Sequence, residues 1–186
     1  MKALITGGLG FIGSNLAHNL VSKGVDVTII DALIPGLGGN EYNIHEIREK
    51  IKLIKEDIRD QKEINEAVKD KDFIFHLAGV IDHNRSIKKP FEDVGIRING
   101  TLSLLEACKK FNKTAKIIFI STRAVYGEIK KNPVDETFPI NPKVMYAISC
   151  LAVEKMLKMY ENLHGIKYTI IRLTNTYGPR HPMFSS

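Results

Sequence analysis

The stretch TGGLGFIGSNL (6–16) follows a short apolar run, KALIT (2–6), and opens an amphipathic pattern that continues to residue 22. Its glycines fit two overlapping patterns, G-x-G-x-x-G at Gly8, Gly10 and Gly13, and G-x-x-G-x-x-G at Gly7, Gly10 and Gly13. Glycines at this spacing permit a tight turn and let the backbone approach a pyrophosphate, at a helix start whose free N–H groups face it. The stretch therefore predicts a strand, a phosphate-binding turn and a helix.

The rest of the chain continues this alternation of strand and helix patterns. Apolar runs rich in Ile, Val and Phe, the expected strands, lie at 2–6, 25–30, 51–54, 72–78, 116–121 and 167–173. Amphipathic patterns, the expected helices, lie near 11–22, 60–69, 91–111 and 142–164. The pattern predicts an α/β fold, a doubly wound parallel sheet (Rossmann-like) with helices on both faces. Such sheets bind ligands just beyond the carboxyl ends of their strands.

Length and composition are those of one globular domain, with 186 residues, 44% of them hydrophobic and 26% charged. No apolar run approaches the ~18 residues of a membrane span, and the N-terminus resembles a strand rather than a signal peptide. We therefore expect no membrane association. Cys108 and Cys150 fall within helical patterns, which favours free thiols in a reducing, cytoplasmic location.

The net charge of +6 does not indicate a nucleic-acid partner. Basic and acidic residues are interleaved, as in KEDIRDQKE (55–63), and no basic stretch is threaded with aromatic residues. We expect a solvated surface of mixed charge, which would still favour an anionic small ligand.

Asp31 ends the second apolar run, where a carboxylate can accept hydrogen bonds from the adenosine ribose hydroxyls. It would repel a 2′-phosphate, and residues 32–40 contain no Arg or Lys to bind one. The glycine turn and Asp31 together predict NAD rather than NADP as cofactor. The alternative is a glycine turn followed by an ordinary loop aspartate. Asp57, after the third run, is either an adenine contact or a helix cap.

Across essentially its whole length the chain resembles the extended short-chain dehydrogenase/reductases, the NAD-dependent nucleotide-sugar epimerases and dehydratases. The matching segments are TGGLGFIGS, EDIRD, FHLAG, RINGTLSLLEAC, ISTRAVYG, YAISC and RLTNTYGPR. The resemblance implies a nucleotide-sugar substrate and a homodimer formed through 91–111 and 142–164.

The resemblance also implies a role for each matching residue of the cofactor site. The pyrophosphate would be held by Gly7, Gly10, Phe11, Ile12 and Gly13. The adenosine ribose would be bound by Asp31, and the adenine by Asp57 and Ile58. The central part of the cofactor would lie against Leu77, Ala78 and Gly79, and its far end near Tyr146.

For the chemistry, the resemblance implies that Thr122 hydrogen-bonds the reacting hydroxyl and that Tyr146 is the general base and acid. Asn99 would support the active site through its amide, and Asn175 would touch the substrate. In the 4,6-dehydratases the two residues after the threonine are acidic, whereas here they are an arginine and an alanine (123–124). The resemblance therefore favours epimerisation through a keto-sugar, or simple oxidation and reduction, over dehydration. With DHNRS (82–86), the chain looks most like epimerases of nucleotide-activated hexoses, including the tyvelose-type ones.

Cys150 departs from the family pattern Tyr-x-x-x-Lys, in which the lysine lies one helical turn beyond the tyrosine. A positive charge ~4 Å from the phenol, at an effective dielectric constant of ~20, favours the phenolate by up to about 4 kcal/mol. Lys155 lies on the opposite helix face and Lys158 farther along. Lys143 precedes the tyrosine near the helix start and points the wrong way unless the loop folds back, so we expect no substitute.

Three explanations of Cys150 stay open: a replacement of lysine in a normal enzyme, a weakened NAD-binding protein, or chemistry without lysine. The alternative is a buried helix cysteine that acts as a small hydrophobe. No metal site is expected, because no second ligand has usable spacing. We expect an NAD-binding domain at 1–178 and the start of a truncated substrate lobe at 179–186. The functional alternatives are a non-catalytic NAD-binding module and a reductase or dehydrogenase of the same fold.

Overall fold

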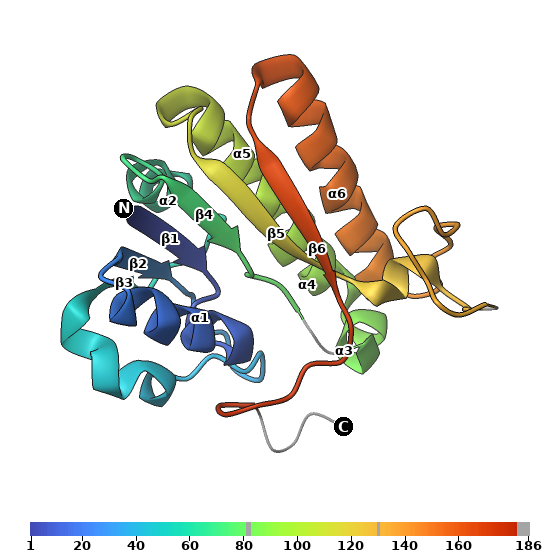
Figure 1. Cartoon of the computed structure of the whole chain (residues 1–186), viewed down its shortest axis with the longest axis horizontal. Helices are drawn as coiled ribbons and strands as arrows, with labels where there is room; N and C mark the ends of the chain where they lie inside the picture. The colour runs from blue at the N-terminus through green and yellow to red at the C-terminus, as the bar shows by residue number, and fades with distance from the viewer. Residues whose placement is uncertain (81–82, 130, 182–186) are drawn as a thin grey trace.

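The computed structural model describes residues 1–80, 83–129 and 131–181, which form a single parallel sheet with helices on both faces (Figure 1). The strands are β1 (Lys2–Thr6), β2 (Asp26–Ile30), β3 (Ile51–Ile54), β4 (Phe73–His76), β5 (Lys116–Thr122) and β6 (Tyr168–Leu173). They pair in the order β3-β2-β1-β4-β5-β6. The order reverses beside β1, where Thr6 is in register with Ile30 on one side and His76 on the other. The predicted doubly wound α/β fold is confirmed.

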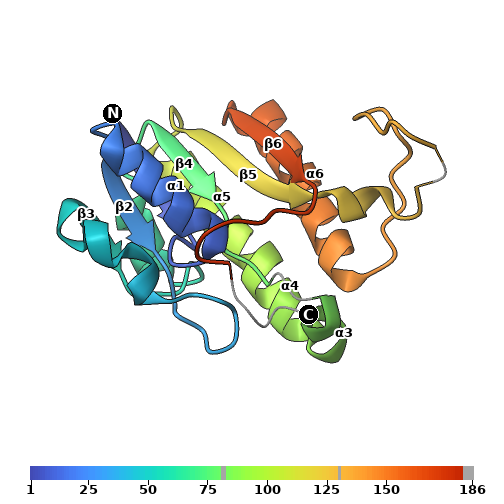
Figure 2. The same cartoon turned by 60° about the horizontal axis from the view of Figure 1, so that its bottom comes forward.

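Helices cover the two faces of the sheet unequally. The α-helices are α1 (Phe11–Ser22), α2 (Gln61–Ala67), α3 (His83–Lys88), α4 (Pro90–Val94), α5 (Gly100–Phe111) and α6 (Met145–His164). Two 3₁₀ segments, η1 (Glu41–Lys50) and η3 (Arg123–Tyr126), and a π-helical segment, η2 (Gly95–Asn99), complete the described elements. Figure 2 shows α1 on one face of the sheet, with α5 and α6 on the other.

Two apolar clusters account for this layering. One packs α1 and η1 onto the sheet through Leu9, Ala17, Val27, Ile29, Ile44 and Ile47. The other packs α2, α5 and α6 through Ile64, Leu104, Leu105, Ile117, Phe119 and Leu157. Each of these residues is at most 8% exposed, so both faces of the central strands are dry. At about 25 cal/mol per Å² of apolar surface, this double burial is the main stabilising contribution to the fold.

The strand and helix predictions are confirmed to within a few residues, with one informative difference. The pattern at 91–111 folds as three consecutive segments, α4, η2 and α5, rather than as one α-helix. A π-helical turn contains an extra residue, so it rotates the following side chains around the helix axis.

The chain after β6 returns across the carboxyl edge of the sheet to the start of α1 (Figure 1). Asn15 Nδ2 donates to the Pro179 carbonyl oxygen at 2.9 Å, and Arg180 Nη2 donates to Asn15 Oδ1 at 2.6 Å. The ring of His181 lies edge-on to Phe11, with 4.8 Å between centroids. None of the described helices has the length and apolar character to span a bilayer.

Candidate active site at the carboxyl edge of the sheet

A cavity of about 260 Å³ lies where the carboxyl ends of the strands meet. Thirteen of the predicted site residues line it: Gly7, Gly10, Phe11, Ile12, Gly13, Asp31, Asp57, Ile58, Leu77, Ala78, Gly79, Thr122 and Tyr146. Asn99, Cys150 and Asn175 do not line it. The sequence analysis missed Arg97, Ser121, Thr176 and His181, which also line the cavity.

The glycine turn between β1 and α1 has no room for side chains at two of its positions. Gly7 has a φ of +69°, in the left-handed region, and a Cβ there would lie 2.8 Å from the Ala78 nitrogen. A Cβ on Gly13 would lie 2.4 Å from the Gly7 carbonyl oxygen. At Gly10, the N-cap of α1, a Cβ would meet only that oxygen, at 3.5 Å. The turn therefore presents bare backbone and a helix N-terminus to the cavity, as a pyrophosphate requires.

Asp31 is held at the end of β2 by backbone donors. Its carboxylate oxygens accept from the Leu33 nitrogen at 2.9 Å and the Leu9 nitrogen at 3.0 Å. Burial raises the pKa of this carboxyl, and the two backbone hydrogen bonds oppose that rise. Asp31 is therefore fixed between the glycine turn and the loop after β2.

Asp57 is engaged by Arg59, whose Nε and Nη2 donate to it at 2.8 and 2.6 Å. This hydrogen-bonded pair lowers the pKa of the Asp57 carboxyl. Asp60, rather than Asp57, caps α2 by accepting from the Lys62 and Glu63 nitrogens. The helix-cap alternative for Asp57 is therefore wrong.

A buried histidine connects the glycine turn with the helices behind the cavity. Thr101 Oγ1 donates to the Arg97 carbonyl oxygen at 2.5 Å, so it accepts from His76 Nε2 at 2.9 Å. His76 Nδ1 is then the acceptor for Thr6 Oγ1, at 2.8 Å. Burial, together with the Arg97 charge, lowers the pKa of His76 to about 3, so the ring is neutral. This network fixes the ends of β1 and β4 beside the cavity.

Thr122 and Tyr146 meet at the other end of the cavity. Thr122, the last residue of β5, accepts from the Ala124 nitrogen at 3.1 Å and caps η3. Tyr146 lies in the first turn of α6, within hydrogen-bonding reach of Thr122. Burial raises the pKa of Tyr146, and the hydrogen bond with Thr122 opposes that rise. The structure thus brings the two predicted catalytic residues together.

Cys150 lies outside the cavity, on the buried side of α6. It is 1% exposed and packs with Val125 and Tyr126 in a third apolar cluster. Burial raises the pKa of its thiol to about 11, so the sulfur is a neutral thiol at physiological pH. Its observed environment is that of a small hydrophobe.

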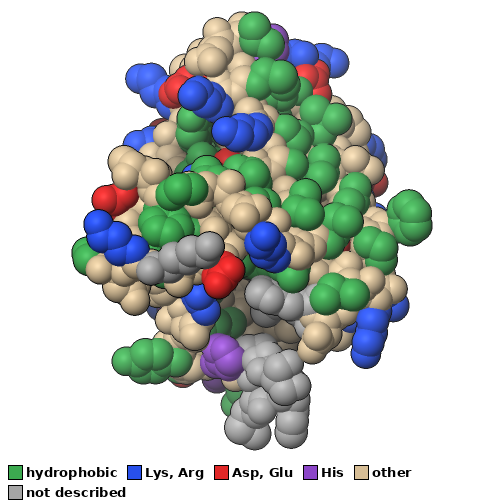
Figure 3. All heavy atoms as spheres, turned by 90° about the vertical axis from the view of Figure 1, so that its right-hand side faces the viewer, with side chains coloured by type: hydrophobic (Ala, Val, Ile, Leu, Met, Phe, Trp, Pro, Cys, Tyr) green, Lys and Arg blue, Asp and Glu red, His purple; other side chains and the backbone are tan. Residues whose placement is uncertain are grey.

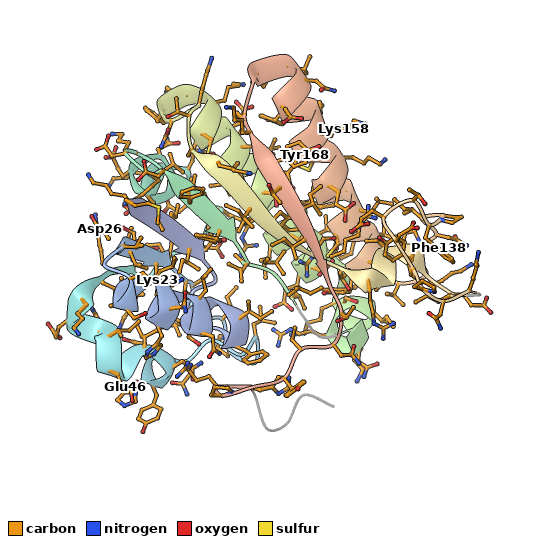
Figure 4. The ribbon with its side chains drawn as sticks, in the orientation of Figure 1. Lys23, Asp26, Glu46, Phe138, Lys158 and Tyr168 are labelled. Atoms are coloured by element: carbon orange, nitrogen blue, oxygen red, sulfur yellow. The ribbon has the colours of Figure 1, made fainter. Side chains whose placement is uncertain are left out.

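A positive charge beside Tyr146 comes from a residue that the sequence analysis did not consider. The guanidinium carbon of Arg97 lies 4.9 Å from the centroid of the Tyr146 ring. The expectation that the chain holds no substitute for the lysine overlooked this arginine. Lys158 lies far along α6 from Tyr146, as expected (Figure 4).

Asn99 and Asn175 are both exposed. Asn99 ends the π-helical segment, whose buried face carries Ile96 and Arg97. Helical spacing accounts for this placement, because Arg97 lies on the same face as the buried Thr101 and Leu104, whereas Asn99 lies on the other side. Asn175 lies in the segment after β6. The structure therefore does not bring these two amides to the cavity. Of the segment DHNRS, Asp82 and the side chain of His83 lie outside the described part of the structure.

Comparison with known proteins identifies the family. The family model for GDP-mannose 4,6 dehydratase matches residues 4–185. The chain belongs to this family, within the extended short-chain dehydrogenase/reductases.

Several relatives in this family are epimerases. The chain is 39% identical, over 95% of its length, to a candidate UDP-glucose 4-epimerase of Methanocaldococcus jannaschii, of which it covers 56%. It superposes with a TM-score of 0.89 and 33% identity on the Thermus thermophilus UDP-glucose 4-epimerase in complex with NAD, covering 98% of this chain and 58% of that one. For the Thermotoga maritima UDP-glucose 4-epimerase with UDP-glucose, the TM-score is 0.91 at 31% identity, covering 99% and 59%. The chain thus spans a little over half the length of its relatives.

Proposed function

We propose that this chain is the NAD-binding part of an NAD-dependent epimerase that acts on a nucleotide-activated hexose. The observation that carries the proposal is the single cavity that joins a side-chain-free glycine turn, a fixed acid at the end of β2 and the Thr122–Tyr146 pair. Family relatives crystallised with NAD and with UDP-glucose support it.

The cavity fits NAD in its shape and in its charges. The glycine turn would take the pyrophosphate, and Asp31 would accept from the adenosine ribose while repelling a 2′-phosphate. Leu77, Ala78 and Gly79 form the wall between the glycine turn and Tyr146. Bound there, NAD would supply the hydride acceptor and donor for transient oxidation of the sugar.

In the proposed reaction Thr122 holds the reacting hydroxyl and Tyr146, as phenolate, takes its proton. Tyr146 returns that proton once the keto-sugar has presented its other face. The substrate's nucleotide would bind in a lobe contributed by the part of the relatives that this chain does not span. We accordingly assign residues 1–178 to the NAD-binding domain and 179–186 to the beginning of that lobe, of which 182–186 lie outside the described residues.

A second candidate, a non-catalytic NAD-binding module, is favoured by one observation. Burial raises the pKa of Tyr146, and the position one turn along α6 carries a neutral thiol instead of a lysine. A third, a reductase or dehydrogenase, would use the same Thr122–Tyr146 pair but release its reduced cofactor.

Calorimetric titration with NAD and NADP tests the shared step. We expect NAD to bind and NADP to bind at least tenfold more weakly, and the absence of binding by either would refute all three readings. Identification of dinucleotide released on denaturation, with assays on UDP- and CDP-hexoses of a version extended by the missing lobe, separates them. An epimerase retains NAD and interconverts sugars, whereas a dehydrogenase releases its reduced cofactor. A non-catalytic module binds NAD but neither converts a sugar nor reduces the cofactor.

We also propose a cytoplasmic homodimer. The two free buried cysteines support the cytoplasmic location.

Large exposed apolar residues on the helices support the dimer: Leu102 on α5, and Ile148, Met159 and Leu163 on α6. Figure 3, which views the molecule from the α6 side, shows hydrophobic side chains across this face. Light scattering at micromolar concentration should give twice the chain mass, and Met159→Glu should lower it. A wild-type monomer at these concentrations would contradict the dimer.

A further inference from the structure

Arg97 places a guanidinium against the ring of Tyr146. Its Cζ lies 4.9 Å from the ring centroid, and the residue is 4% exposed. A guanidinium keeps its charge throughout the accessible pH range. In a low-dielectric site it favours a phenolate over a phenol much more strongly than it would in water. Tyr146 therefore has a permanent positive charge beside it, although position 150 carries none.

Contacts from the loop after β4 and from α4 hold this guanidinium in place. Arg97 Nη2 donates to the carbonyl oxygen of Val80 and lies 3.5 Å from the Asp93 carboxylate. Asp93, which is fully buried, also accepts from Ser149 Oγ on α6 at 2.5 Å. The guanidinium has room to lie here because residue 79 is a glycine, since a Cβ on Gly79 would lie 2.5 Å from Arg97 Nη1. Arg97 is thus connected through Asp93 to the residue that precedes Cys150.

The ion pair with Asp93 does not by itself explain a buried arginine here. Within residues 1–80, 83–129 and 131–181, nothing accepts the proton of Arg97 Nε, although this atom is buried. Burying an ion pair commonly contributes no more stability than apolar side chains of the same volume would. An unused buried donor adds a cost of about 1–3 kcal/mol. A role toward Tyr146 explains why the charge lies at this place.

We propose that Arg97 supplies to Tyr146 the positive charge that a lysine at position 150 would supply, which allows Tyr146 to act as the base without that lysine. The inference rests on the proposed function, in which Tyr146 takes the hydroxyl proton. Arg97 touches the ring of the reacting group and is a charge-supplying residue rather than a proton-transfer residue.

The charged and titratable groups around Tyr146 are consistent with this assignment. Burial raises the pKa of Tyr146 most, and from η2 Arg97 opposes that rise more than the Thr122 hydrogen bond from β5 does. From α6, a Cys150 thiolate would raise it, but the thiol stays neutral up to about pH 11. From α4, Asp93 raises it least. Glu154, farther along α6, is engaged by Arg172.

The test is the ionisation of Tyr146 itself. A fluorinated tyrosine, whose phenol is more acidic than that of tyrosine, is incorporated biosynthetically, and Tyr146→Phe assigns its fluorine NMR signal. In Arg97→Gln the apparent pKa of residue 146 should rise by about one pH unit or more, whereas Arg97→Lys should keep most of the wild-type value. In Arg97→Gln/Cys150→Lys the pKa should fall again, because the charge then comes from α6. An unchanged pKa in folded Arg97→Gln would overturn the proposal.

Arg97→Gln leaves Asp93 buried without its partner and could unfold the chain. In that case the double variant Asp93→Asn/Arg97→Gln, which removes both buried charges together, is compared with the single variant Asp93→Asn. The pKa should again be higher in the variant that lacks Arg97, and equal values would overturn the proposal.

The ionisation readout needs neither NAD nor sugar, so it separates the two proposals. If NAD fails to bind while the Arg97 effect is present, the proposed function fails and the charge assignment stands. If NAD binds and the sugar turns over while Arg97→Gln leaves the pKa unchanged, the proposed function stands and the charge assignment fails.

Discussion

Alanine substitutions at two neighbouring glycines should separate the stability of the turn from its ligand binding. In Gly13→Ala the new Cβ would lie 2.4 Å from the Gly7 oxygen and 2.7 Å from the Gly8 Cα. Both atoms belong to the backbone of a packed turn and cannot rotate away. Overpacking of this kind costs about 1–3 kcal/mol. At roughly 2–4 °C per kcal/mol for a domain of this size, the melting temperature should fall by about 2–12 °C.

Gly10→Ala is the matched control. Its Cβ meets only the Gly7 oxygen, at 3.5 Å, and the φ of −76° suits any residue. Replacing the N-cap glycine of α1 by alanine should lower the free energy of unfolding by a few tenths of a kcal/mol, up to about 1 kcal/mol. The added methyl group therefore enters the cavity rather than the protein.

Gly10→Ala should melt close to the wild type but bind NAD at least tenfold more weakly, a loss of about 1.4 kcal/mol or more. Gly13→Ala should lose both stability and binding. Melting curves and calorimetric titration with NAD measure the two effects. If Gly10→Ala bound NAD as tightly as the wild type, the turn would not be the pyrophosphate site. If Gly13→Ala melted normally, the argument from the Gly7 contact would be wrong.

Three further predictions concern groups around the same cavity. His76 has a folded-state pKa of about 3, below its ordinary 6.5, so the unfolded chain takes up the proton first. The contribution of neutral His76 to the free energy of unfolding should therefore be complete above pH 6.5 and should decrease toward pH 3, by up to about 4–5 kcal/mol. Urea titrations should show a smaller decrease of the unfolding free energy in His76→Gln. Glu154→Gln should cost about 3 kcal/mol in urea denaturation, because it leaves the charge of Arg172 without its 2.7 Å carboxylate partner; the exposed Glu66→Gln should change stability by at most about 0.5 kcal/mol. Asp31→Asn should weaken NAD binding by roughly ten- to a hundredfold, the value of a charged hydrogen bond, and narrow the preference over NADP in paired calorimetric titrations.

Local patterns were sufficient to predict the fold because the sheet is buried on both faces. Runs such as KIIFIS, short and rich in Ile, indicated strands of a parallel sheet covered by helices, and the glycine stretch indicated where the first strand turned into a helix. The segment η1 was missed because it carries few apolar residues. Its two buried positions, Ile44 and Ile47, are too few to form the apolar stripe by which a helix is recognised.

The turn and both acids of the cavity were predictable because each lies in the segment that follows a strand. Helical spacing also puts Arg97 on the buried face that carries Thr101 and Leu104. Its contact with Tyr146 was not predictable, because it joins residues far apart in the sequence. The hydrogen bond from Thr101 to the Arg97 carbonyl and the contact with Gly79 form only in the folded chain.

The charge at Tyr146 is likewise a property of the folded site rather than of the spacing along α6. Position 150 faces Val125 and Tyr126, and Arg97 already lies on the ring of Tyr146. A lysine introduced at 150 would lose solvation and would meet the like charge of Arg97 across the phenol. Its effect on Tyr146 should therefore be smaller in the wild type than in the Arg97→Gln background, because the two residues share one partner and their effects are not additive. Cysteine at 150 is compatible with a charged site, since the charge beside the phenol ring comes from Arg97 on η2.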